Sequence, residues 1–257
     1  MTGALAELLG LTQTLLWQGF VTFLRVGPAL SLLPAFGEQS VPMRVRLALA
    51  LAFTAIAAPA VAPVPNDPPE GLVWLLLAET VNGVVIGIGI RMFILALQTA
   101  GSMAAQATSL AQVFGGAASE PMPAIGHVLV VAALALAVMS GLHVRVAELL
   151  IWSYDPLPMG RFPAAASLSD WGTTEVSHAF SLAFSLAAPF VIVSVLYNLT
   201  LGVINRAMPQ LMVAFVGAPV ITAGGLALLF LLSPVILERW HDALTRFLAQ
   251  PFAGVGP

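Results

Sequence analysis

Glu79 is the most conspicuous chemical group of this sequence, because it lies inside a long apolar stretch. Asn82, Gly83 and Gly87 follow it at spacings of three, four and eight residues, which places all four on one face of a helix. Because the two glycines form a close-packing motif, we expect this face to contact protein and not lipid. The acid could relay a proton or an ion, or it could be hydrogen-bonded across a contact with another helix or subunit. We favour the second, since no further acid or histidine lies in register to continue a relay.

Arg91 lies in the same apolar stretch, twelve residues after Glu79. At 1.5 Å per residue the two side chains would be about 18 Å apart along one helix. They cannot pair with each other, so we expect each to find a partner on another segment.

The remaining polar residues form no pattern of a catalytic or metal site. The histidines, at positions 127, 143, 178 and 241, fall in different segments, and none has a second ligand four residues away. The chain has no cysteine, and its nine cations are all arginine, so thiolate and lysine chemistry are excluded. Ser140-Gly141 resembles the nucleophile motif of intramembrane serine proteases, but Val138 stands where that motif needs glycine. We predict neither an enzyme nor a cofactor.

Two arginines mark a corner between apolar stretches at residues 38–46. Pro42 can start a helix that carries Arg44 and Arg46 in its first turn, where the helix dipole disfavours cations. Something outside the helix must therefore stabilise them. Phosphates of lipids and carboxylates of a partner subunit are both open.

A second corner joins the two most apolar segments and is very short. Asn205 can cap a helix, and Pro209 suits a first helical turn, with Arg206 and Gln210 beside them. This pattern predicts a tight helical hairpin.

The composition identifies the setting in which these residues must work. Apolar residues make up 59% of the 257 positions and charged residues only 8%, with a mean hydropathy of +0.97. Such values are typical of membrane proteins and exclude an ordinary soluble domain. The formal charge is −3 and no basic run occurs, so nucleic acid is not a predicted partner. Residues 1–10 carry Glu7 and no cation, so we expect the N-terminus to be retained.

Hydropathy predicts about six hydrophobic helices arranged as packed, kinked hairpins, followed by an amphipathic helix at residues 238–248. Pro189 and Pro219 should kink the last two apolar helices. Residues 100–126 are small and weakly polar and should not form a lipid-facing span, and residues 154–175 should be a polar connection. The expected apolar segments are residues 8–33, 47–61, 72–98, 125–151, 176–204 and 211–237.

At the two corners the chain resembles the FliR family, the export-gate subunit of flagellar and virulence type III secretion systems. The resemblance covers nearly the whole length, as a single helical domain over residues 1–257. Besides residues 38–46 and the glycines after Glu79, it rests on Thr99-Ala-Gly101 and, most specifically, on residues 198–211, Asn-Leu-Thr-Leu-Gly-Val-Ile-Asn-Arg-Ala-Met-Pro-Gln-Leu.

The resemblance implies a structural pore subunit that assembles with FliP-like and FliQ-like subunits in the bacterial cytoplasmic membrane, within the flagellar basal body. FlhB-like and FlhA-like export proteins and membrane lipid would be further partners, and unfolded export substrates would cross the pore. It also implies that the helices of the assembled gate need not all cross the bilayer. The subunit contacts expected from it are made by Arg44, Arg46, Glu79, Gly83, Gly87, Asn205, Arg206, Pro209 and Gln210.

The resemblance further implies a pore plug in the loop at residues 107–123. Its candidate residues are Phe114, Gly115, Gly116 and Met122, although the Asp-Pro pair of the family is absent. Use in a virulence injectisome is an alternative to flagellar use. A small-solute secondary transporter is a weaker alternative, because Pro189 and Pro219 do not occupy matched positions in two repeats.

Overall fold

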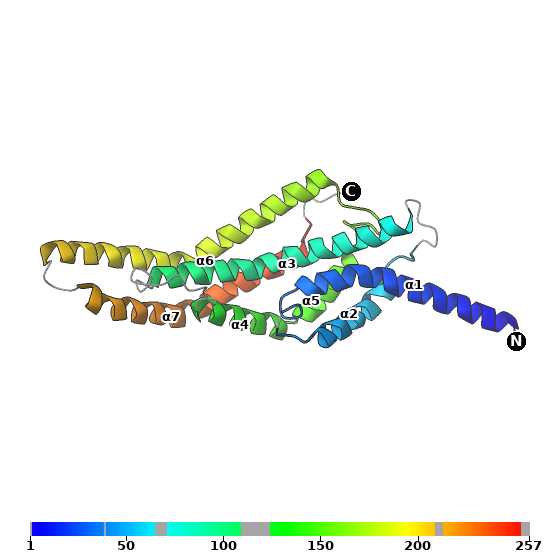
Figure 1. Cartoon of the computed structure of the whole chain (residues 1–257), viewed down its shortest axis with the longest axis horizontal. Helices are drawn as coiled ribbons and strands as arrows, with labels where there is room; N and C mark the ends of the chain where they lie inside the picture. Colours follow the sequence, from blue (N-terminus) through cyan, green and yellow to red (C-terminus); the bar gives the residue numbers. More distant parts are fainter. Residues whose placement is uncertain (1, 39, 65–70, 109–123, 209–212, 253–257) are drawn as a thin grey trace. The chain divides into compact units, whose positions relative to one another are not determined.

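The computed structural model describes residues 2–38, 40–64, 71–108, 124–208 and 213–252. This part of the chain contains seven α-helices and one short 3-10 helix, and no strand (Figure 1). The predicted all-α class is therefore confirmed. The elements are α1 (Thr2–Leu32), α2 (Met43–Ala57), η1 (Ala58–Ala60), α3 (Leu72–Thr108), α4 (Ala124–Met139), α5 (Leu142–Trp152), α6 (Ala165–Ala207) and α7 (Val213–Ala249).

Five helices of the described part are long and apolar enough to cross a membrane, and a bent helix pair brings the number to six. The prediction of about six hydrophobic helices is thus confirmed. The five stretches are Thr12–Leu32, Met43–Ala60, Leu72–Thr108, Ala165–Ala207 and Val220–Ala249.

The fourth predicted segment is broken, which corrects the expectation of one continuous helix over residues 125–151. Helices α4 and α5 meet at an angle of 73°. Gly141 lies between them with a φ of +84°, in the left-handed region that favours glycine and ends a helix. The glycine of the Ser140-Gly141 pair therefore makes a bend.

Three helices extend further than the sequence pattern indicated. Helix α3 continues past the expected segment of residues 72–98 to Thr108, and α6 begins at Ala165, inside the expected polar connection. Helix α7 runs on to Ala249, so residues 238–248 form its last turns and not a separate interfacial helix. The apolar face of that stretch is buried in the protein, with Trp240 fully buried and Leu244 nearly so.

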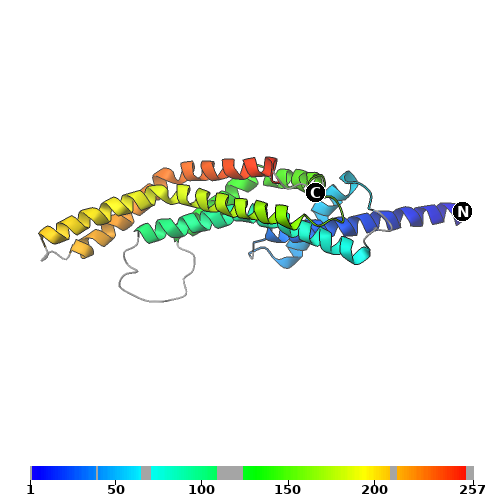
Figure 2. The same ribbon diagram turned by 90° about the horizontal axis from the view of Figure 1, so that it is seen from above.

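The chain forms two compact units, and α3, α6 and α7 contribute to both. The first unit contains Met1–Arg91, Val138–Glu175 and Thr245–Pro257, and the second contains Met92–Ala137 and Val176–Leu244. In both views the N-terminal end of α1 extends past the other helices of the first unit (Figures 1 and 2).

Helices α1 and α3 pack in parallel in the first unit, at the two glycines that follow Glu79. A Cβ atom on Gly83 would overlap the backbone of Arg25, and one on Gly87 would crowd Ala29 and Leu32. Residue numbers increase in the same direction along both helices at this contact, so the two helices run parallel. Parallel packing requires the chain to return between the two helices, as α2 does.

In the second unit glycines again mark the closest helix contacts. Gly101 of α3 touches Gly126 of α4, and Gly225 of α7 faces Thr108 of α3. The indole of Trp240 donates a hydrogen bond of 2.8 Å to the Phe93 carbonyl. Residue 225 of α7 thus meets residue 108 of α3 and residue 240 meets residue 93, so the two helices run antiparallel.

The predicted hairpin between the last two apolar helices is present. The end of α6 and the start of α7 lie side by side in both views (Figures 1 and 2), and Gly217 packs against Tyr197 and Leu201. Pro189 lies inside α6, which continues through it.

Candidate functional site

A fully buried ion pair joins α1 to α3. The guanidinium of Arg25 donates from Nε to Glu79 Oε2 at 2.8 Å and from Nη2 to Glu79 Oε1 at 3.0 Å. Both side chains have no exposed surface. The bidentate geometry is the strong form of this contact. The expectation that Glu79 is hydrogen-bonded across a protein contact is thus confirmed, and its partner is a helix of the same chain.

The same two side chains hold the connection that follows α5. Arg25 also donates from Nη1 to Ser153 Oγ at 3.2 Å and from Nη2 to the Leu157 carbonyl at 2.9 Å. Glu79 Oε1 accepts a further bond of 2.9 Å from the amide of Gly160, whose φ is +73°. We call the group of Arg25, Glu79 and the contacts at residues 153–160 the charge clasp.

Tyr154 completes the charge clasp with its ring. The guanidinium carbon of Arg25 lies 3.6 Å from the centroid of that ring, a cation–π contact. Burial raises the pKa of the Tyr154 hydroxyl to about 12, and the nearby Arg25 charge only partly opposes that effect. The tyrosine is therefore a neutral cover over the cation at any physiological pH.

A second ion pair lies closer to the surface of the same unit. Arg91 Nη1 donates to Glu38 Oε1 at 2.8 Å, and the two side chains are 29% and 25% exposed. This pair ties α3 to the connection between α1 and α2. Arg91 and Glu79 have thus found separate partners on other segments, as the 18 Å spacing predicts.

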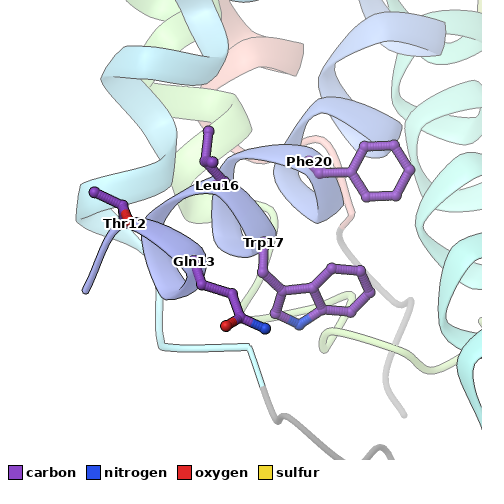
Figure 3. A pocket seen from close by; sticks show the side chains of 5 residues that line it. All are labelled: Thr12, Gln13, Leu16, Trp17 and Phe20. Carbon is purple, nitrogen blue, oxygen red and sulfur yellow. The ribbon is translucent and has the colours of Figure 1, made fainter. Parts of the chain in front are cut away.

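A shallow depression lies on the surface of α1, lined by Thr12, Gln13, Leu16, Trp17 and Phe20 (Figure 3). All five residues come from one helix, so the depression has no opposite wall that could enclose a small ligand. Trp17 packs at its edge against the buried cluster of Val21, Val64 and Leu75. The described residues also contain no group of three or more His, Asp or Glu that could hold a metal ion.

Large apolar side chains remain exposed along α6 and α7. Only 28% of the most apolar window of α6 is buried, and only 17% of that of α7. Phe230 is 81% exposed, and Leu199 and Leu231 are each 66% exposed. Such faces require lipid or another protein to cover them.

Comparison with known proteins settles which family has this architecture. Residues 16–247 match the family described as bacterial export proteins, family 1. The chain is 31% identical over 234 residues to the flagellar biosynthetic protein FliR of Caulobacter vibrioides, covering 89% of this chain and 93% of the relative. This chain belongs to the FliR family. It is also 30% identical over 222 residues to FliR of Escherichia coli K12, with 84% of each chain covered, and 26% identical to FliR of Bacillus subtilis.

In this FliR-family chain, the face of α3 that carries Glu79 packs against α1 of the same chain. Glu79 and Asn82 are fully buried, and Gly83 and Gly87 meet the backbone and side chains of α1. Asn82 donates from Nδ2 to the Arg161 carbonyl at 3.1 Å. These residues are used to fold the subunit, and we do not include Glu79, Gly83 and Gly87 in a proposed contact between subunits.

The arginines of the first FliR corner differ from each other. Arg46 is half-buried and donates from Nε to the Val41 carbonyl at 3.1 Å. This hydrogen bond stabilises the corner in which both residues lie. Arg44 is exposed and has no ion pair or side-chain hydrogen bond within the described part of the chain. Arg44 is thus the arginine that remains available to lipid or to a partner.

At the second FliR corner Asn205 and Arg206 are exposed residues in the last turn of α6, which ends at Ala207. Asn205 is therefore a helical residue and does not cap α7, contrary to the expectation from the sequence. Pro209 and Gln210 lie outside the described residues, as do the plug candidates Phe114, Gly115, Gly116 and Met122. Ala107 and Thr108, at the start of the expected plug loop, belong to α3.

The sequence analysis did not single out Arg25, Tyr154 or Gly160. One signal could have found the pair: an isolated cation and an isolated acid lie inside two different apolar segments, where each is costly without the other. The contacts from residues 153–160 had no such signal, because they are mostly made by backbone groups and by a ring.

Proposed function

We propose that this chain is a structural pore subunit of the flagellar type III protein export gate, without a catalytic role of its own. The observation that carries the proposal is the family match over residues 16–247. The name shared by the relatives, flagellar biosynthetic protein, favours flagellar use over use in a virulence injectisome. The gate would sit in the cytoplasmic membrane, within the flagellar basal body.

The helix lengths support a role inside an assembly. Helix α3 has 37 residues, α6 has 43 and α7 has 37. At 1.5 Å per residue these helices are about 55 to 65 Å long, roughly twice the thickness of the hydrocarbon core of a bilayer. Apolar side chains that extend beyond the lipid need protein to cover them, and FliP-like and FliQ-like subunits are the partners that we propose.

The first test combines export with capture of partners. Deletion of the gene in its own host should abolish swimming and the release of hook and filament proteins into the medium, and the full-length gene should restore both. A tagged chain should co-purify with FliP-like and FliQ-like subunits, and with FlhB-like and FlhA-like proteins more weakly. Normal flagellar export in the deletion strain would contradict the proposal, and loss only of virulence effectors would point to an injectisome.

We also propose that residues 109–123 restrict the closed pore, with Phe114 and Met122 as bulky groups on the hinge of Gly115 and Gly116. Replacing Phe114 with Ala should leave assembly of the gate intact and increase ion leakage through the reconstituted complex. Exposed Phe184→Ala, on α6, is a matched aromatic control that should not leak. If the Phe114 variant assembles and conducts no more than the parent, these residues do not form the plug.

A further inference from the structure

Two buried hydroxyl groups beside the charge clasp have no hydrogen-bond partner. Thr22 is fully buried on α1, one turn before Arg25, and its Oγ1 is unpaired. The hydroxyl oxygen of Tyr154, whose ring lies under the Arg25 guanidinium, is also buried and unpaired. Buried polar atoms in proteins are nearly always satisfied by protein or by ordered water.

Thr22 lacks a hydrogen bond that more than half of the other threonines of this chain make. A helical threonine in apolar surroundings usually donates its hydroxyl proton to the carbonyl four residues earlier. Seven threonines do so here, and Thr22 does not, although Gln18 offers the same carbonyl. The seven are Thr14, Thr54, Thr80, Thr108, Thr173, Thr174 and Thr200.

The Thr22 hydroxyl lies near Tyr154. It lies close enough to the Tyr154 hydroxyl to lower the pKa of that group, against the larger effect of burial. This effect is the one that a side-chain hydrogen bond from Thr22 has, but the contact does not meet the distance and angle requirements of a hydrogen bond, so neither oxygen is satisfied by it. The pair therefore forms a polar spot in an apolar setting with both of its members unsatisfied.

The charge clasp itself has unused capacity next to this spot. Arg25 uses four of its five N–H donors, and one proton of Nη1 has no partner. Glu79 Oε2 accepts only the bond from Arg25 Nε, whereas Oε1 accepts two. A small molecule that can both donate and accept would satisfy several of these atoms at once.

We propose that Thr22 and Tyr154 bind an internal water molecule that forms part of the charge clasp. Water has two donors and two acceptors, and buried waters typically make about three hydrogen bonds to otherwise unsatisfied groups. This ligand matches two hydroxyls next to a guanidinium and a carboxylate. It satisfies polar atoms that would otherwise remain unpaired in the apolar interior of a membrane protein.

The first experiment compares two threonine-to-valine substitutions in the full-length protein in detergent. Thr22→Val removes a water ligand and should lower the melting temperature by about 2 to 4 °C, the shift typical of one lost buried hydrogen bond in a chain of this size. Thr54→Val is the control, because Thr54 is also buried but bonds only to the Ala50 carbonyl of its own helix. The control should melt within about 1 °C of the parent.

Tyr154→Phe and the double variant test whether the two hydroxyls share one ligand. Each single change removes the water, so the loss in the double variant should be clearly smaller than the sum of the two losses. A density map of the purified protein at a resolution that shows ordered water should contain a peak within hydrogen-bond distance of both oxygens.

Two results would overturn the proposal. If the melting temperature of Thr22→Val is no lower than that of Thr54→Val, the Thr22 hydroxyl makes no stabilising hydrogen bond. If the map shows a direct hydrogen bond between Thr22 and Tyr154 with no peak beside them, the hydroxyls satisfy each other and no water is bound.

Discussion

At the scale of single residues, Arg25 has the largest structural role that the structure reveals. Its side chain contacts α3 through Glu79, and it contacts the connection that follows α5 through Ser153, Tyr154 and the Leu157 carbonyl. Burying two charges costs free energy that their attraction repays only when the geometry is good and the remaining polar groups are bonded. The charge clasp meets these conditions through its bidentate pair and the Gly160 amide.

Replacing Arg25 with Met should therefore destabilise the protein strongly. The change leaves the Glu79 carboxylate buried without a counter-ion, which costs about 3 to 5 kcal/mol of unfolding free energy. Arg91→Met is the control, since the exposed Arg91–Glu38 pair should contribute less than about 1 kcal/mol. Denaturant titration of the purified chain in detergent measures both.

The double variant Arg25→Met/Glu79→Met separates charge from packing. It removes both buried charges, so it should recover part of the stability that Arg25→Met alone loses. A double variant that is less stable than Arg25→Met by a full second increment would show that the two residues act independently.

Tyr154 should make the stability of the protein sensitive to alkali. Its pKa is raised from 10 to about 12 in the folded protein, so between these values the unfolded chain loses a proton that the folded chain keeps. The unfolding free energy then falls as the pH rises, by about 1.4 kcal/mol per pH unit, and below pH 10 the group has no effect. Arg25 and Glu79 are the charged groups that face the Tyr154 hydroxyl.

Tyr154→Phe keeps the ring over Arg25 and removes the ionisable hydroxyl. Above pH 10 the variant should therefore lose less stability per pH unit than the parent, and the two melting curves should converge as the pH rises. Tyr197 is present in both proteins, and so it cancels in the comparison. Identical slopes above pH 10 would contradict the assigned role of Tyr154.

At the scale of elements, the glycines of α3 set how closely α1 can approach. Gly83→Ala would place a methyl group into the backbone of Arg25 and separate the helices that carry the ion pair. We expect a loss of about 1 to 3 kcal/mol of unfolding free energy. Gly19→Ala is the matched control on α1, where nothing lies within 4 Å, and it should stabilise the helix by about 0.5 to 1 kcal/mol. Equal effects of the two changes on denaturant titration would exclude a tight contact at Gly83.

The sequence predicts most of the elements because long apolar stretches identify hydrophobic helices well. It places Glu79 and the two glycines on a protein-contacting face, and it predicts that Glu79 and Arg91 have separate partners. It does not predict the bend at Gly141, because hydropathy does not distinguish a helix from a bent pair of equal composition. It also misses the contacts of residues 153–160, where backbone groups bind the charges.

At the scale of the whole molecule, buried charges give no reason for this chain to depend on partners. Arg25 pairs with Glu79 and Arg91 pairs with Glu38, so these four charges find their partners within the chain. The exposed apolar faces of α6 and α7 supply the reason instead. Assembly should therefore depend on surface residues, and Arg44 and Arg206 are exposed cations at the two corners of the family motif.

Arg44 and Arg46 should respond differently to replacement by lysine. Lysine keeps the positive charge but loses the planar fork of donors that binds a carboxylate in bidentate geometry. If Arg44 pairs with a carboxylate of a neighbouring subunit, Arg44→Lys should lower the yield of the co-purified complex by several-fold and leave the melting of the isolated chain unchanged. Arg46→Lys removes the hydrogen bond to the Val41 carbonyl, so it should lower the stability of the chain itself.

Arg145→Lys is the control for a general effect of lysine, since Arg145 is an exposed cation on α5 and lies in neither corner. A phosphate of a lipid headgroup accepts lysine almost as readily as arginine, because a point charge satisfies it. An unchanged complex yield in Arg44→Lys would therefore assign Arg44 to the membrane surface and remove it from the proposed subunit contact. A reduced yield, with the Arg145 control at the parent level, would place a carboxylate of a partner opposite Arg44.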